Sequence, residues 1–512
     1  MQGMTMGNII RRVAQRYPNR EALIFKDTRL TYADFNQQIN QLAHALMRLG
    51  LPKGSVVAIF SQNRHEYLEA YFACAKVGLV LNTLNWRLSP REITFMINQS
   101  DSRVLLIEDQ YQDFFHDFLD ELHCAHVVIL NGVPRLPHAV ALAQFTAAMP
   151  ADEPRVAVSP DDAVLLLYTS GTTGTPKGAL LTQSNVVWDA MAYLYHTEIR
   201  TGDKLLQPMP FIHVSGIHIL TMVFLFKGLP VVIQPVFDPA ETCRLIEKER
   251  CTVACILVPA LQALMRYEHL TQHDFSSLRL VLTAAASYTR ELCYEATARL
   301  GLEKLLIGYG LTEATPAVTM TEHTGETLWK ENCLGWPIWT DDVRVVTPEG
   351  ADVPIGDVGE LLVHGPNVFK GYLGLTEATD RALRDGWLWT GDLVRMDSDG
   401  CLFFVDRSKD MIKSGGENIY AVEVEMALMQ ANPEIQEAIV IATPDDKWGE
   451  AVTALLVLKP GHSVAPEVIT ERTRTELASY KLPKKIHFIT EVPRSISGKV
   501  QKHLLRKTFG GQ

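Results

Sequence analysis

The sequence lacks the features that would place the chain in a membrane or in an oxidising compartment. Met1 to Arg12 shows no charged and then apolar signal peptide. The longest apolar run, Ile217 to Phe226, ends at Lys227 and is too short to span a bilayer. The eight cysteines form no CxxC pair and no zinc pattern, so buried free thiols are expected. We therefore expect a cytoplasmic protein, for which peripheral membrane contact stays open.

Excess positive charge is also missing. The net charge is −11, which argues against nucleic-acid binding through bulk charge. The segment from Lys481 to Lys507 is the exception, because it contains eight basic residues and only one acid, Glu491. Such a tail is either a solvated face or a surface for an anionic substrate. At 512 residues the chain is too long for one core, so we expect two or more domains.

The fold class follows from how the apolar segments alternate along the chain. Buried strand patterns such as Val56–Phe60 and Val104–Ile107 alternate with helical patterns such as the amphipathic helix expected at Glu66–Val77, which predicts a parallel α/β sheet. Beyond about Gly335, short strands separated by Gly, Pro and Asp turns predict an antiparallel β subdomain. A small α+β domain is expected from about Asp410 to the end of the chain.

The segment Tyr168–Gly178 predicts a phosphate-binding loop. It combines three glycines, five serine or threonine side chains and one lysine with no acid, and it follows the apolar run Ala163–Tyr168. It is not a Walker A loop, because Pro176 precedes Lys177, Gly178 follows it, and another short strand is expected before the next helix. A P-loop nucleoside triphosphatase is therefore disfavoured.

Two further motifs carry residues suited to a nucleotide, and a third segment is a charged connection. In Ile307–Glu313, two glycines permit close approach of a flat ligand, and Thr312 and Glu313 supply a phosphate donor and a hard oxygen for Mg²⁺. Asp392, within a Thr-Gly-Asp turn, can accept hydrogen bonds from two vicinal hydroxyls, or it can be an ordinary turn residue. Asp406–Asp410 holds four charges in five residues, which predicts a solvated connection.

These motifs, together with Ile412–Ile419 and Pro493–Lys499, occur in the order found in the adenylate-forming superfamily. The chain resembles this superfamily of acyl- and aryl-CoA synthetases, luciferases and adenylation domains. The resemblance implies that Glu313 and Thr169 bind Mg²⁺, and that Lys499, Thr312 and His213 serve catalysis beside Glu313. It implies contacts to ATP or coenzyme A by Thr169, Ser170, Gly171, Thr172, Thr173, Gly174, Lys177, Ala285, Ala286, Gly308, Tyr309, Gly310, Thr312, Asp392, Arg407, Lys409, Lys413, Ser414, Gly415 and Gly416.

Two segments differ from the pattern of the superfamily. The usual Gly-Gly-Ala segment beside adenine is Thr283–Ala286 here, and alanine restricts positive φ. The acyl-site motif Pro210–Gly216 lacks the Asp that pairs with an amino-acid ammonium, so an amino-acid substrate is disfavoured. The resemblance places His213 near the carboxylate, and Gly216 and Thr315-Pro316 in the acyl pocket.

The function that we expect is an AMP-forming acyl-CoA synthetase that converts a fatty or aromatic carboxylate to acyl-CoA through acyl-AMP. The alternatives are an adenylation enzyme that loads a carrier-protein phosphopantetheine and, more remotely, a luciferase-like oxidative enzyme. The expected cofactors are ATP, Mg²⁺ and coenzyme A, and an acyl carrier protein or a second copy of the chain are possible partners. The resemblance implies a large domain over residues 1–405, a hinge at 406–409 with Lys409 as pivot, and a small domain over 410–512.

Overall fold

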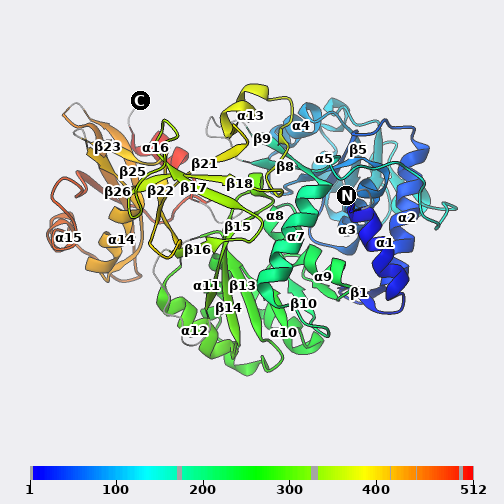
Figure 1. Ribbon diagram of the computed structural model, residues 1–512, viewed down its shortest axis with the longest axis horizontal. Helices are drawn as coiled ribbons and strands as arrows, with labels where there is room; N and C mark the ends of the chain where they lie inside the picture. Colours follow the sequence, from blue (N-terminus) through cyan, green and yellow to red (C-terminus); the bar gives the residue numbers. More distant parts are fainter. Residues whose placement is uncertain are drawn as a thin grey trace. The chain divides into compact units, whose positions relative to one another are not determined.

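The computed structural model describes the chain apart from residues 1–3, 170–175, 287, 324–332, 415–416, 446, 495–499 and 511–512. The chain forms two compact units (Figure 1). The first holds residues 1–343 and 363–389, and the second holds 344–362 and 390–512. The predicted combination of a large α/β part and a smaller C-terminal α+β part is confirmed. The predicted hinge, 406–409, lies within the second unit and stays a prediction.

One sheet of the first unit carries the predicted phosphate loop. Its strand order is β19-β9-β8-β4-β3-β5-β6-β7. The strands from β8 to β7 in this order are parallel, whereas β9 runs antiparallel to β8, as the short strand after the glycine loop predicted. The strand bounds are β3 (Val56–Phe60), β4 (Val80–Leu84), β5 (Ser102–Ile107), β6 (His126–Ile129), β7 (Val140–Ala141), β8 (Ala163–Thr169), β9 (Lys177–Thr182) and β19 (Gly371–Tyr372).

A second run of strands in the first unit has the order β16-β15-β14-β13-β12-β10-β11-β1-β2. The strands from β14 to β1 are parallel, and β15 and β2 are antiparallel to their neighbours. The parallel strands are almost fully buried, because helices cover both faces of such a sheet. The bounds are β1 (Glu21–Phe25), β2 (Thr28–Thr31), β10 (Leu205–Gln207), β11 (Val231–Ile233), β12 (Val253–Cys255), β13 (Leu280–Ala284), β14 (Lys304–Gly310), β15 (Ala317–His323) and β16 (Cys333–Pro337).

Several helices of the first unit begin at side-chain caps that the sequence provides. Thr31 and Asp34 form a capping box at the start of α2, and Thr182 caps α7 directly after β9. The main helices are α1 (Met6–Arg16), α2 (Tyr32–Arg48), α3 (His65–Val77), α4 (Pro90–Gln99), α7 (Gln183–Thr197), α8 (Val214–Ile217), α9 (Thr221–Lys227), α10 (Pro239–Glu249), α11 (Val258–Met265), α12 (Arg290–Leu300) and α13 (Thr376–Ala382).

Helix α3 differs from the amphipathic helix that the sequence predicted. It contacts α1 and α2, and every residue after His65 is buried. Its two carboxylates are paired inside this environment. Glu66 forms an ion pair with Arg64 at 2.7 Å, and Glu69 contacts the His65 ring at 2.7 Å. The polar residues that suggested a solvent-facing side are therefore compensated within the protein.

The second unit combines two small sheets. The strands β17 (Asp342–Val346), β18 (Val358–His364), β21 (Trp387–Met396) and β22 (Leu402–Arg407) lie in this order. The chain crosses from one unit to the other within β17, β18 and β21. The other sheet has the order β24-β23-β26-β25, with β27 beside β26, and packs against α14. Its elements are β23 (Ile412–Ser414), β24 (Glu417–Ile419), α14 (Ala421–Ala431), β25 (Ile435–Asp445), β26 (Gly449–Leu458), α15 (Pro466–Thr473), β27 (Lys485–Phe488) and α16 (Lys502–Phe509).

The charged segment Asp406–Asp410 is only partly solvated, which corrects the prediction of a solvated connection. Asp406 is buried and accepts hydrogen bonds from the backbone N–H groups of Arg407, at 2.7 Å, and Ala421, at 2.5 Å. Ala421 is the first residue of α14, whose N-cap Tyr420 makes no side-chain cap bond. Asp406 therefore supplies the cap from a distant part of the sequence, and burial raises its pKa.

The cysteines and the helices agree with the first expectations. All eight cysteines are free thiols, and all but Cys124 are buried. Within the described part of the chain, the longest apolar helices fall short of what crossing a membrane requires.

Candidate active site

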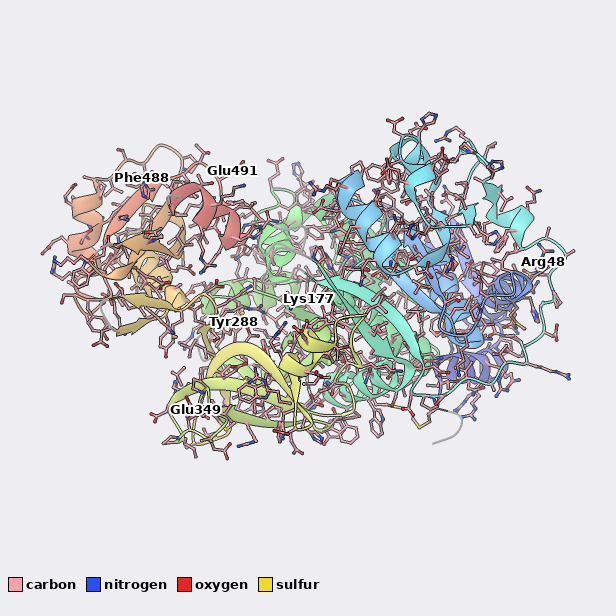
Figure 2. All side chains as sticks on the ribbon, turned by 90° about the horizontal axis from the view of Figure 1, so that it is seen from above. Arg48, Lys177, Tyr288, Glu349, Phe488 and Glu491 are labelled. Atoms are coloured by element: carbon pink, nitrogen blue, oxygen red, sulfur yellow. The ribbon has the colours of Figure 1, made fainter. Side chains whose placement is uncertain are left out.

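The two ends of the predicted phosphate loop lie side by side. Thr169 ends β8 and Lys177, which Figure 2 labels, begins β9, and the two are paired across the strands. The Thr169 hydroxyl donates to the Lys177 carbonyl oxygen at 3.4 Å. Ser170, Gly171, Thr172, Thr173 and Gly174 lie outside the described residues. The sheet therefore fixes the base of the loop, with one lysine and one hydroxyl at its two ends.

Tyr372 joins this base to Glu313. The Lys177 ammonium lies 5.2 Å from the centre of the Tyr372 ring, and the Tyr372 hydroxyl donates to Glu313 Oε1 at 2.7 Å. The Phe369 N–H also donates to the Glu313 carbonyl oxygen at 2.8 Å. Burial and the nearby Glu313 carboxylate raise the pKa of Tyr372, so its hydroxyl stays protonated and can donate. The structure thus brings a cation, an aromatic ring and a carboxylate together from three distant segments.

Glu313 lies in η4 (Thr312–Ala314), a short helix that follows β14 and contacts β9. This contact places Thr312 and Glu313 near the base of the phosphate loop, as the motif predicted. Sequence reasoning missed Tyr372, because a Gly-Tyr pair 59 residues from Glu313 has no local pattern that identifies its partner. Its position in β19, paired to β9, became visible only in the fold.

The two predicted adenine segments end neighbouring strands. Ala284 pairs with Gly308 at the carboxyl ends of the parallel strands β13 and β14, so Ala285 and Ala286 follow at the same edge as Tyr309. Both alanines are exposed, and this edge of a parallel sheet is where ligands usually bind. Ala285 adopts φ +76°, the conformation that the glycine of related sequences would take without strain.

Gly308 and Gly310, the two glycines of the Tyr309 motif, have different surroundings. A Cβ at Gly308 would have its nearest neighbours, the Thr319 carbonyl oxygen and the Tyr193 hydroxyl, 3.9 Å away, which is ordinary van der Waals contact, so the approach of a flat ligand there stays a prediction. A Cβ at Gly310 would lie 1.6 Å from the Pro316 carbonyl oxygen. Residue 310 must therefore be glycine because the backbone at Pro316 lies so close to it, whether or not a ligand binds there.

The acyl-site motif forms the one-turn helix α8. His213 is its N-cap and is half-buried, whereas Phe211 and Ile217 are fully buried. Gly216 is held against the chain, since a Cβ there would lie 2.1 Å from the Pro210 carbonyl oxygen. Gly216 is thus fixed by backbone packing, which accounts for it without a role in the acyl pocket.

In the second unit, Asp392 and Arg407 form an ion pair. They face each other across β21 and β22, and Arg407 Nε lies 2.8 Å from Asp392 Oδ1. The Asp392 side chain is 1% exposed, whereas that of Arg407 is 39% exposed. The structure therefore brings the two predicted ribose or phosphate ligands together and leaves the guanidinium accessible.

The remaining predicted residues of the second unit lie along the start of its sheet. Lys409 is exposed after β22, Lys413 is exposed within β23, and Ser414 is buried at the end of β23. The Lys413 N–H donates to Glu450 at 2.7 Å. Gly415, Gly416 and Lys499 lie outside the described residues, so their assigned roles stay predictions.

A cationic aromatic cluster in the second unit was not predicted. The ammonium groups of Lys447 and Lys484 lie 4.7 and 5.3 Å from the Trp448 ring centre. Burial, and then the charge of Lys447, lower the pKa of Lys484. Two ammonium groups beside one indole form a surface suited to an anionic ligand with a flat ring. The only sign of this cluster in the sequence was the excess of basic residues between Lys481 and Lys507, a segment that includes Lys484.

A magnesium site at Glu313 fits the donor chemistry. A carboxylate and a hydroxyl are oxygen ligands that Mg²⁺ prefers, and Mg²⁺ commonly takes its other ligands from phosphate and water. Among the residues that the structure describes, no group of three or more His, Cys, Asp or Glu side chains could hold a metal by itself.

The chain is similar to known proteins over almost all of its length. The family of AMP-binding enzymes matches residues 10–373, and its C-terminal domain matches residues 423–499. The chain is 36% identical to a feruloyl-CoA synthase of an Amycolatopsis species, over 100% of both chains. It is 34% identical to the indoleacetate–CoA ligase of Aromatoleum aromaticum, over 99% of both. The ATP-bound structure of MatB from Rhodopseudomonas palustris matches with a TM-score of 0.89 at 27% identity, over 98% of this chain and 99% of that chain.

These matches span both units and include three of the predicted motifs, Tyr168–Gly178, Ile307–Glu313 and Pro493–Lys499. The relatives are named as CoA ligases or synthetases, which is the activity that the motifs predicted. The chain therefore belongs to the AMP-binding enzyme family and is an acid–thiol ligase.

Proposed function

We propose that this enzyme is an Mg-ATP-dependent acyl-CoA synthetase that activates an uncharged aromatic or fatty carboxylic acid through acyl-AMP. The observation that carries the proposal is the convergence of Lys177, Tyr372 and Glu313 at the base of the phosphate loop. A lysine suited to phosphate and a carboxylate suited to Mg²⁺ both contact Tyr372 there.

In the first half-reaction, a carboxylate oxygen attacks the α-phosphorus of ATP and the bond to pyrophosphate breaks. Lys177 and the loop before it would hold the β- and γ-phosphates, and Glu313 would hold the Mg²⁺ that neutralises them. Tyr372 keeps the Glu313 carboxylate in one orientation through its hydroxyl. Lys499 is proposed to stabilise the charge that develops between the carboxylate and the α-phosphate.

In the second half-reaction, the thiol sulfur attacks the carbonyl carbon of acyl-AMP. The bond from the acyl carbon to the AMP oxygen breaks, AMP leaves and the thiol proton passes to solvent. The segment from Lys413 to Gly416 is proposed to bind the pantetheine arm. Mixed-anhydride formation is needed first, because a free carboxylate is a poor electrophile.

Free coenzyme A is the proposed acceptor. It carries a phosphorylated nucleotide that a carrier-protein phosphopantetheine lacks. The cluster of Lys447, Trp448 and Lys484 offers two cations and a stacking surface of the kind that such a nucleotide needs. Thioester formed only with a carrier protein would favour the alternative acceptor.

An aromatic acid is the first substrate class to test. Two relatives are named for the aromatic acids ferulate and indoleacetate. The acyl-site segment Pro210–Gly216 offers uncharged side chains and no carboxylate to pair with an ammonium group. A panel of aromatic, fatty, amino and dicarboxylic acids, assayed for pyrophosphate release, separates the classes, and preference for an amino acid would contradict the proposal.

A further inference from the structure

A second histidine, His218, lies two residues after the acyl-site motif, and the proposed chemistry does not use it. His218 follows the last residue of α8, so His213 and His218 lie at the two ends of one helical turn. Its side chain is completely buried. Nε2 lies 2.9 Å from the Tyr71 hydroxyl, and Nδ1 lies 3.1 Å from the Thr315 carbonyl oxygen.

The partners of His218 determine which nitrogen carries the proton. Burial lowers the pKa of His218 to about 4, so the ring is neutral at pH 7. The Thr315 carbonyl oxygen can only accept, and therefore Nδ1 carries the hydrogen and donates. Nε2 then accepts from the Tyr71 hydroxyl, which stays protonated because burial raises its pKa.

Thr315 ends the loop that carries Thr312 and Glu313. It has φ +69°, which is unusual for a β-branched residue and requires support from its surroundings. Its hydroxyl donates to the Asn367 carbonyl oxygen at 2.6 Å, and Asn367 Nδ2 donates to the carbonyl oxygens of Ala314, at 3.0 Å, and Ala317, at 2.6 Å. Asn367 and His218 thus fix the end of η4 through separate hydrogen bonds.

The bond from His218 to Thr315 is therefore a direct link between two functional segments. One is the acyl-site turn that begins at His213, and the other is the loop that presents Tyr309, Thr312 and Glu313 to the nucleotide and metal. We propose that His218 is a positioning residue that couples the acyl site to the nucleotide loop, so that one hydrogen bond sets the geometry of both substrates. This inference rests on the proposed function of the two segments.

Two substitutions at residue 218 separate this role from a general contribution to packing. In His218→Asn, the side-chain amide can occupy the place of Nδ1 and still donate to Thr315. In His218→Gln, the amide reaches toward Tyr71 and the bond to Thr315 is lost. Tyr71→Phe removes the other partner of the imidazole and leaves Nδ1 in place.

We expect His218→Gln to lower the rate of carboxylate-dependent ATP–pyrophosphate exchange about tenfold and to raise the KM values of both ATP and the acid. His218→Asn and Tyr71→Phe should stay within about threefold of the wild type. Melting temperatures of all three variants provide the comparison, because a packing role predicts losses that follow stability. Equilibrium ATP binding, measured by calorimetry, should weaken in His218→Gln alone.

The inference is overturned if His218→Gln retains wild-type exchange and ATP affinity, or if activity in all three variants falls in parallel with melting temperature. Failure of the proposed function has a different signature. In that case the wild-type enzyme itself would show no pyrophosphate exchange with any carboxylic acid, while the calorimetric comparison of the variants would still test the link to the nucleotide loop.

Discussion

The Tyr372 hydroxyl donates to Glu313 Oε1 at 2.7 Å, across 59 residues of sequence. This bond connects the sheet that carries the phosphate loop with the loop that follows β14. It orients the carboxylate that is proposed to bind Mg²⁺, while the Tyr372 ring lies 5.2 Å from the Lys177 ammonium. One tyrosine thereby fixes the relation between the proposed metal ligand and the proposed phosphate ligand.

Tyr372→Phe should lower acyl-AMP formation about tenfold, because loss of one oriented hydrogen bond frees the Glu313 carboxylate. The concentration of Mg²⁺ needed for half-maximal rate should rise. Pyrophosphate release at varied Mg²⁺ measures both effects. Tyr294→Phe is the matched control, since Tyr294 is 51% exposed on α12. Equal Mg²⁺ dependence in Tyr372→Phe and the wild type would exclude this role.

Ala285→Gly should give a free energy of unfolding about 1 kcal/mol higher than that of Ala286→Gly, because glycine adopts φ +76° without the steric cost that alanine has there. Urea unfolding measures the change. Ala286→Gly provides the control, since Ala286 is not among the residues with positive φ and glycine there only adds flexibility to the unfolded chain. Equal destabilisation by Ala285→Gly and Ala286→Gly would show that the alanine conformation at residue 285 is not strained.

Asp341 predicts a pH dependence of stability. Burial raises its pKa to about 7, and its carboxylate accepts from Asn367 at 3.0 Å and Thr340 at 2.9 Å. Between about pH 4 and pH 7 the folded protein therefore keeps a proton that the unfolded chain has lost. This group's contribution to stability is complete below the unfolded pKa and is lost as pH rises through 7, by at most about 1.4 kcal/mol per pH unit.

Asp341→Asn should flatten this part of the stability profile, and urea unfolding between pH 5 and pH 8 measures the slope. Asp189 contributes a residual slope of the same sign, because burial also raises its pKa. Asp342→Asn changes a neighbouring carboxylate that is 84% exposed and whose charge is the smallest of the causes acting on the Asp341 pKa, so it should reduce the slope only slightly. A wild-type slope in Asp341→Asn would assign the pH dependence to other groups.

Trp448→Ala should raise the KM for coenzyme A about tenfold and leave acyl-AMP formation within twofold of the wild type, because stacking of one base on an aromatic ring contributes roughly 1–3 kcal/mol. Thioester formation at varied coenzyme A, compared with pyrophosphate release in its absence, measures the two steps separately. Trp339→Ala, at a tryptophan that is 51% exposed in the first unit, is the control. An unchanged KM in Trp448→Ala would remove the proposed nucleotide contact.

The sequence predicted those parts of the site that are contiguous in the chain. The strand, glycine loop and second strand around Lys177 were readable because a buried apolar run, turn residues and Thr182 follow one another. The Tyr309–Glu313 motif was readable for the same reason. Local order of residue types was sufficient there, and the structure places these segments where the motifs predicted.

The supporting residues could not be predicted in this way. Tyr372, Asn367 and His218 act on residues between 50 and 97 positions away, so no local pattern marks their partners. The sequence also predicted that Asp406 lies in a solvated connection, whereas burial of one carboxylate as the cap of α14 depends on tertiary packing. Long-range hydrogen bonds to backbone groups leave little trace in residue types.

The most direct test of the account is pyrophosphate release by the wild-type enzyme across the carboxylate panel, with and without coenzyme A. We predict release with an aromatic or fatty acid in the absence of coenzyme A, at about one equivalent per enzyme while acyl-AMP stays bound, followed by turnover and thioester formation when coenzyme A is added. Pyrophosphate release that needs no carboxylate, or acyl-AMP that coenzyme A does not consume, would contradict it.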